Sequence, residues 1–188
     1  MSSQLDSKFF LKREAAVLLI VDIQDKLAPA VTDSARVIGQ SAALLQGAVL
    51  MNLPVMVTEQ YPRGLGGTIE QIRQHLPTDA VISEKISFDA CTEEIRQALI
   101  TSGRRQVIIA GMETHVCVYQ TVRSLLNEGY EVFLAADAVS SRRQDNRDNA
   151  IESMRQMGSV ISNTETLLFD LLKEAGTPLF KQVSALIK

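Results

Sequence analysis

The strongest constraint on this chain is the alternation of short, almost wholly apolar segments with segments whose apolar residues recur at helical spacing. Strands that are apolar on both faces are typical of parallel sheets covered by helices on both sides. The sequence therefore predicts an α/β fold of three layers, α/β/α, with a six-stranded parallel sheet. The predicted strands are residues 16–23, 54–59, 81–84, 106–111, 131–136 and 160–162.

Helices are expected between these strands, and nothing in the sequence divides the chain. Asn163 or Thr164 is expected to cap the helix after the sixth strand, with Glu165 in its first turn. The sequence has no internal repeat or linker, so we expect one domain over residues 1–188. The other predicted helices are 34–51, 68–75, 92–101, a segment ending near 127, 147–157 and 181–187.

Composition excludes several classes of protein. The net charge of −3 argues against a nucleic-acid partner, which would favour a basic surface. The longest apolar run, 15–21, is too short to cross a membrane, and residues 1–8 lack an apolar signal core. Cys91 and Cys117 form neither a CxxC pair nor a zinc-ligand spacing, so we expect free thiols and a cytoplasmic location.

Three residues with chemical potential follow predicted strands. Open α/β sheets bind ligands beyond the carboxyl ends of their strands, where the strand order reverses. Asp22 ends the first strand, Lys85 follows the third, and Cys117 lies six residues past Gly111, near the end of the fourth. With the strand order 3-2-1-4-5-6, Asp22 and Cys117 would face each other and Lys85 would reach in from the side.

These three residue types together suit nucleophilic catalysis. A helix start and a nearby ammonium both lower the pKa of a thiol, and the thiolate is its reactive form. A carboxylate can take the thiol proton and return it to a leaving group. Each residue also has a simpler interpretation: Cys117 as a buried structural cysteine, Asp22 as a turn cap, and Lys85 as a solvated side chain.

Five stretches together resemble the isochorismatase-like hydrolases, and among them the short isochorismatase domain-containing proteins. The resemblance implies an Asp–Lys–Cys triad at Asp22, Lys85 and Cys117. It also implies a cis peptide bond between Met112 and Glu113, and an oxyanion site made by the N–H groups of Glu113 and Cys117. The stretches are LLIVDIQDKL (18–27), VTEQYPRGLGGT (57–68), EKISFDA (84–90), VIIAGMETHVCV (107–118) and AADAVSSR (135–142).

Further residues are candidates for the wall of a substrate pocket. Phe88 resembles an aromatic residue that lines the pocket in this family, although core packing is an equally good interpretation. Cys91 is interpreted as structural. The full set of pocket candidates is Gln24, Tyr61, Phe88, Met112 and His115.

No metal or organic cofactor is expected. The nicotinamidase branch of the family has metal-binding histidines after its second strand, whereas residues 58–62 here read TEQYP. The first strand is followed by DIQDKLAPA, which has no glycine. The predicted sheet is therefore Rossmann-like but lacks a dinucleotide fingerprint.

The sequence thus favours a cysteine hydrolase acting on a small amide, imide or related carbonyl compound. Two alternatives remain open: an isochorismatase that cleaves a vinyl ether, and a binding protein that has kept the fold without turnover. The resemblance also implies a homo-oligomer.

Overall fold

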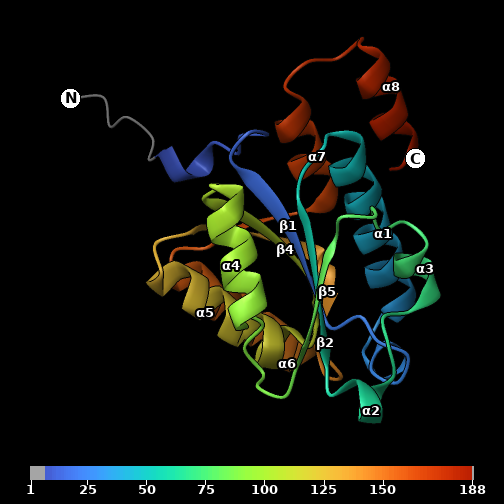
Figure 1. The fold of residues 1–188 in the computed structure, drawn as a ribbon, viewed down its shortest axis with the longest axis vertical. Coiled ribbons are helices and arrows are strands. Elements are labelled where there is room, and N and C mark those ends of the chain that lie inside the picture. The colour runs from blue at the N-terminus through green and yellow to red at the C-terminus, as the bar shows by residue number, and fades with distance from the viewer. Residues whose placement is uncertain (1–6, 188) are drawn as a thin grey trace.

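A computed structural model describes residues 7–187, in which a six-stranded sheet lies between two layers of helices (Figure 1). All neighbouring strands pair in parallel, in the order β3-β2-β1-β4-β5-β6. The predicted fold class and strand order are therefore confirmed. The strands are β1 (Ala16–Val21), β2 (Val55–Gln60), β3 (Val81–Lys85), β4 (Gln106–Met112), β5 (Glu131–Ser140) and β6 (Val160–Ser162).

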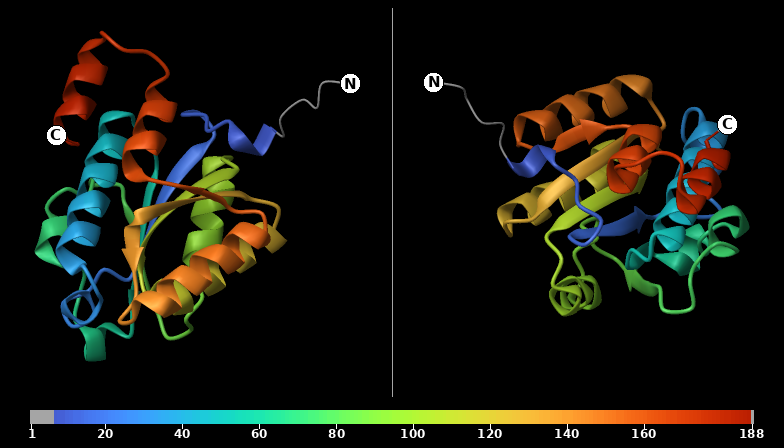
Figure 2. Two further views of the ribbon diagram at one scale, coloured as in Figure 1. Left: turned by 180° about the vertical axis from the view of Figure 1, so that it is seen from behind. Right: turned by 90° about the horizontal axis from the view of Figure 1, so that it is seen from above.

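The strand residues alternate between two hydrophobic clusters, one on each face of the sheet. Leu18 and Ile20 of β1 belong to the cluster under α1, whereas Val17 and Leu19 belong to the cluster under α4 and α5. Figure 2 shows the two helical layers from behind and from above. One layer holds α1 (Ser34–Leu50), α3 (Glu70–Arg73), α7 (Thr164–Leu172) and α8 (Pro178–Ala185); the other holds α4 (Glu93–Ser102), α5 (Tyr119–Asn127) and α6 (Gln144–Gln156).

Several boundaries differ from the prediction, and for the last helix a side-chain cap gives the reason. The last helix starts at Pro178, since Thr177 accepts a hydrogen bond from the Phe180 N–H and proline suits the first helical turn. Asn163 caps α7 through the N–H of Thr166, as expected. The helix predicted over 68–75 shrinks to α3, α6 begins at Gln144, β5 extends to Ser140, and a short helix, α2 (Pro62–Leu65), was not predicted.

The first and last described helical segments, Ser7–Phe9 and α8, lie away from the carboxyl ends of the strands (Figure 1). Residues 1–6 of the polar segment 1–8 lie outside the described residues. Within 7–187, no helix combines the length and the apolar character that crossing a membrane requires.

Candidate active site

At the carboxyl ends of β1 and β4, the two backbones leave no room for a side chain between them. Gly111 of β4 pairs with Val21 of β1, and a Cβ atom at position 111 would lie 2.0 Å from the Val21 carbonyl oxygen. Gly111 also has φ +137°, a conformation that L side chains rarely adopt. Only glycine permits this approach, which sets Asp22 beside the loop that carries Cys117.

Asp22 and Lys85 form a buried ion pair at this edge of the sheet. Lys85 Nζ donates to Asp22 Oδ2 at 2.7 Å, and the two side chains are 1% and 0% exposed. The other carboxylate oxygen, Oδ1, accepts a hydrogen bond of 2.7 Å from Thr58 Oγ1. Asp22 has φ +53°, so the chain turns sharply where β1 ends.

The ammonium of Lys85 is surrounded by oxygen atoms. Besides Asp22, it donates to Gln60 Oε1 at 2.8 Å and to the carbonyl oxygens of Ser87 and Phe88 at 3.3 and 3.1 Å. An ammonium can donate three hydrogen bonds and accept none. These partners therefore use all of its donors and hold its positive charge in place.

Sequence reasoning missed Thr58 and Gln60, which contact Asp22 and Lys85 from β2. They are buried polar residues two positions apart at the end of β2, on either side of the partly buried Glu59. Residues at that spacing share one face of a strand. That pattern was the available signal.

Cys117 lies in a single π-helical turn, Thr114–Val118, between β4 and α5, and it is 5% exposed. Burial, together with the charge of Asp22 and a hydrogen bond to it, raises the pKa of the Cys117 thiol from 9.0 to about 12. Lys85 lowers this pKa without offsetting the other causes. Burial and the nearby Asp89 raise the pKa of Cys91 as well.

The expectation that Lys85 and a helix start would give Cys117 a low pKa is therefore wrong for the free protein. The thiol holds its proton at neutral pH, and reaction at Cys117 requires a base. The charge and hydrogen-bond effects on its pKa place Asp22 close enough to serve as that base.

The loop around Cys117 is tied to the end of β5. The Met112–Glu113 peptide bond is cis. The Glu113 carboxylate accepts hydrogen bonds of 3.1 and 3.0 Å from the backbone N–H and the Nε of Arg142, so this side chain turns toward the segment before α6. His115 Nδ1 lies 2.9 Å from Ser141 Oγ, and no contact joins it to the Asp22–Lys85 pair.

The structure separates the other pocket candidates into two groups. Tyr61 and Phe88 are each 51% exposed and flank Lys85: the Tyr61 N–H donates to the Lys85 carbonyl, and the Phe88 carbonyl accepts from Lys85 Nζ. Gln24 and Met112 are fully buried. The Gln24 amide binds the backbone of Gln60 and Gly66, and Met112 packs in the core under α1, so neither side chain is placed to face a ligand.

Comparison with known proteins identifies the family. Residues 16–166 match the isochorismatase domain. The chain belongs to the isochorismatase family. The "Isochorismatase domain-containing protein 2" of Danio rerio is 37% identical over 94% of this chain and 89% of its own length. The "Secreted isochorismatase effector Isc1" of Phytophthora sojae is 38% identical, over 93% and 85%.

Solved structures of this family have the same fold. The MAR1 ribonuclease from Caenorhabditis elegans has a TM-score of 0.90 and 33% identity, over 94% of this chain and 91% of its own. YcaC from Pseudomonas aeruginosa, solved with hexane-2,5-diol and covalent acrylamide, has a TM-score of 0.89 and 26% identity, over 97% and 93%. YcaC from Escherichia coli, an octameric hydrolase of unknown specificity, has a TM-score of 0.83 and 26% identity, over 94% and 86%.

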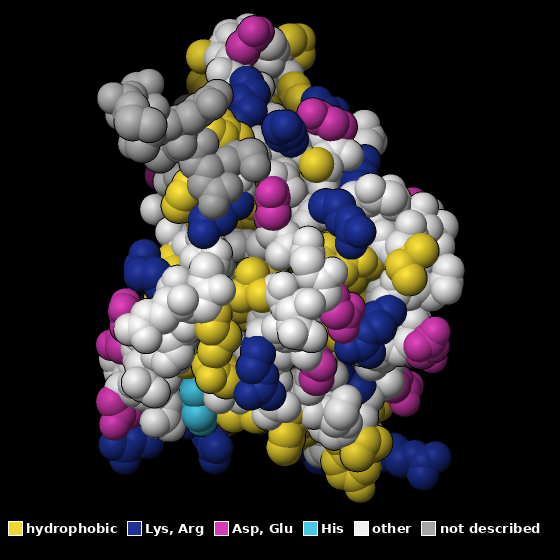
Figure 3. Space-filling model, turned by 90° about the vertical axis from the view of Figure 1, so that its left-hand side faces the viewer, with side chains coloured by type: hydrophobic (Ala, Val, Ile, Leu, Met, Phe, Trp, Pro, Cys, Tyr) yellow, Lys and Arg dark blue, Asp and Glu magenta, His cyan; other side chains and the backbone are white. Residues whose placement is uncertain are grey.

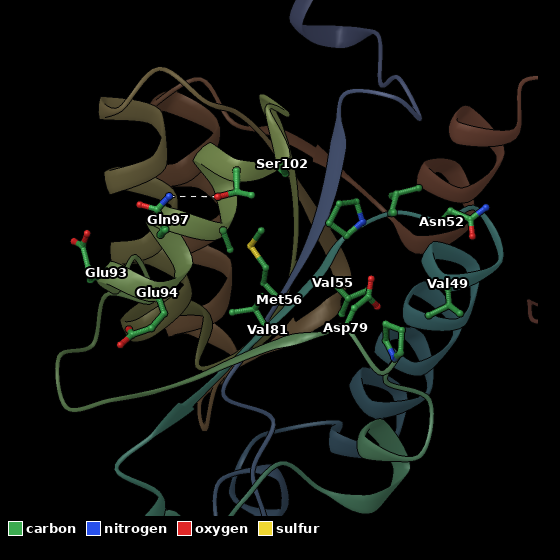
Figure 4. A pocket seen from close by; sticks show the side chains of 15 residues that line it. Val49, Asn52, Val55, Met56, Asp79, Val81, Glu93, Glu94, Gln97 and Ser102 are labelled. Atoms are coloured by element: carbon green, nitrogen blue, oxygen red, sulfur yellow. Dashed lines mark hydrogen bonds between the residues drawn. The ribbon is translucent and has the colours of Figure 1, made fainter.

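A cavity in this isochorismatase-family protein lies away from these residues. It has a volume of about 790 Å³ and lies between α4 and the segments that enter β2 and β3 (Figure 4). Val55 and Val81, at the amino ends of these strands, line it. Gln60 and Lys85 lie at the opposite ends of the same strands, so this cavity is not the substrate site of the Asp22–Lys85–Cys117 group.

Residues 7–187 contain no group of three or more His, Cys, Asp or Glu side chains that could hold a metal ion. The described side chains hydrogen-bonded to the Asp22 carboxylate are the Lys85 ammonium and the Thr58 hydroxyl.

Proposed function

We propose that this protein is a cysteine hydrolase that cleaves a small amide, imide or related carbonyl compound, with Cys117 as nucleophile. The buried Asp22–Lys85 pair beside the Cys117 thiol carries the proposal. Asp22 is the proton acceptor, and the hydrogen bond from Lys85 orients that carboxylate.

The first half of the reaction forms a thioester. Asp22 takes the proton of the Cys117 thiol while sulfur attacks the carbonyl carbon, and the carbonyl electron pair moves to oxygen. The N–H groups of Glu113 and Cys117 stabilise this oxyanion. When the tetrahedral intermediate collapses, the C–N bond breaks and protonated Asp22 gives its proton to the leaving nitrogen.

The second half consumes water and restores the enzyme. Asp22 takes a proton from water, and the hydroxide attacks the thioester carbon. The C–S bond then breaks, the carboxylic acid leaves, and the sulfur regains the proton from Asp22. The net reaction is the hydrolysis of one C–N bond, and the mechanism includes no metal or cofactor.

A relative supports a reactive cysteine in this fold. Acrylamide is an electrophile that thiols attack, and it is covalently bound in YcaC from Pseudomonas aeruginosa. Tyr61 and Phe88, half-exposed beside Lys85, are the candidates for the apolar walls around a small substrate.

The test is a panel of small amides and imides, read by intact-protein mass for an acyl adduct and by product release. Wild-type protein should show turnover and a trapped adduct, and Cys117→Ser should show neither. Cys91→Ser is the matched control and should keep both activities. Full turnover by Cys117→Ser would overturn the proposal.

The same experiment separates the alternatives. Release of pyruvate from isochorismate without a covalent adduct would identify a vinyl ether hydrolase. Ligand binding without turnover by any substrate of the panel would identify a binding protein.

We further propose a cytoplasmic homo-oligomer whose only ligand is a small molecule. The Escherichia coli relative is octameric, and light scattering of the purified chain tests assembly directly. Figure 3 shows Lys and Arg interspersed with Asp and Glu on one face, without a continuous basic surface for nucleic acid. Because relatives include a ribonuclease and a secreted effector, RNA cleavage and the compartment should be assayed directly.

A further inference from the structure

We propose that Thr58 is a positioning residue of the reaction, whose hydroxyl holds the Asp22 carboxylate aimed at Cys117. This inference rests on the proposed function, in which Asp22 is the base. It assigns a role on β2 outside the Asp–Lys–Cys group itself.

Thr58 holds Asp22 at two points. Its hydroxyl donates to Asp22 Oδ1 at 2.7 Å, and its carbonyl oxygen accepts the Asp22 backbone N–H at 3.1 Å. Both residues are fully buried. Water therefore has no access to replace the hydroxyl if it is removed.

Each oxygen of the Asp22 carboxylate accepts one hydrogen bond from a neighbouring side chain. Lys85 occupies Oδ2 and Thr58 occupies Oδ1, so the carboxylate plane is fixed by one bond at each oxygen. A carboxylate has about four acceptor sites, so these two bonds leave capacity for the thiol proton of Cys117. Hydrogen bonds to the ionised form also favour that form over the neutral acid.

Lys85 cannot replace Thr58 as the hydrogen-bond donor to Asp22 Oδ1. The Lys85 ammonium is already committed to Gln60 and to the carbonyl oxygens of Ser87 and Phe88, in addition to Asp22. Without the hydroxyl, Oδ1 would be a buried anionic oxygen lacking that donor. The carboxylate would then rotate toward Lys85, and this rotation turns the base away from Cys117.

The test compares Thr58→Val, which keeps the shape and loses the hydroxyl, with Thr58→Ser, which keeps the hydroxyl. Thr58→Val should lower kcat by about 10- to 100-fold while KM changes by less than about 3-fold, because the base is misplaced and substrate binding is kept. Thr58→Ser should stay within about 3-fold of wild type in both kcat and KM. Thr101→Val, on α4 near the amino ends of β2 and β3, is the control for exchanging threonine for valine away from the site.

The outcomes distinguish this inference from the proposed function. If Thr58→Val loses activity only in step with its melting temperature, or if its KM changes as much as its kcat, Thr58 is merely structural and the inference is overturned. The same holds if Thr58→Ser loses as much activity as Thr58→Val. If Cys117→Ser is as active as wild type, the proposed function itself fails.

Discussion

Lys85 Nζ and Asp22 Oδ2 are 2.7 Å apart, and neither side chain is more than 1% exposed. Both residues lie at strand ends, Lys85 closing β3 and Asp22 following β1, with β2 between them. The pair therefore spans three strands, and β2 supplies a hydrogen-bond partner to each member. This arrangement ties the chemistry of the site to the stability of the sheet.

Breaking this pair should be costly. Lys85→Met leaves the carboxylate of Asp22 buried without its counter-ion, and we expect a loss of about 3–5 kcal/mol in the free energy of unfolding. Asp22→Asn should cost a similar amount, and the double variant should cost less than the sum. Lys173→Met breaks the half-exposed pair with Asp170 and should change stability by less than about 1 kcal/mol. Urea denaturation measures all four, and strictly additive single effects would contradict the prediction.

Removing Asp22 should separate thiol reactivity from turnover. Asp22 raises the pKa of the Cys117 thiol, so Asp22→Asn should lower that pKa and speed alkylation by iodoacetamide at pH 7–8. The same variant lacks the base and should lose turnover. Alkylation sites are assigned by peptide mass spectrometry, with Cys91 as internal reference. Unchanged or slower alkylation of Cys117 in Asp22→Asn would contradict this prediction.

Stability should fall in alkaline solution because of Cys117. Its pKa is raised from 9.0 to about 12 on folding, so between these values the unfolded chain loses a proton that the folded chain keeps. The contribution is fully present below pH 9 and is lost as pH rises toward 12, by up to about 1.4 kcal/mol per pH unit. Cys117→Ser should lack this loss, so its stability relative to wild type should improve from pH 9 to 10.5. A constant difference between the two proteins over this range would refute the assignment.

Gly111→Ala should be among the most damaging single-methyl changes in this chain. The new Cβ would lie 2.0 Å from the Val21 carbonyl oxygen, at a φ that L residues rarely adopt. We expect a loss of about 3 kcal/mol or more, or failure to fold. Gly39→Ala is the matched control: it is a helical position with nothing within 4 Å of the added methyl, and should gain up to about 1 kcal/mol. Thermal melts of both variants measure the contrast.

The sheet was predictable because β1, β4 and β5 contain continuous apolar runs. Such runs are typical of strands in a parallel sheet that is covered on both faces. The predicted strand order was enough to place Asp22 beside the loop of Cys117, and no side-chain contact was needed for that prediction. The single-domain organisation and the roles of the site residues stay predictions.

The electrostatics of the site were not predictable from the sequence. The charge of Lys85 is visible there, but the depth at which Cys117 is buried is not, and burial is the larger influence on its pKa. Gln24 was expected to face substrate, yet its amide is fully used by the backbone of Gln60 and Gly66. A polar residue between strand and loop suits either role, and only the folded chain decides between them.

The 790 Å³ cavity between α4 and the start of β3 has a practical consequence for inhibitor discovery. A library screened by thermal shift would select compounds that occupy this roomy hollow, because any ligand bound only to the folded chain raises its melting temperature. Such hits would lie far from the proposed site at the carboxyl ends of β1 and β3. Screening should therefore begin with electrophilic fragments counted by their covalent mass on Cys117.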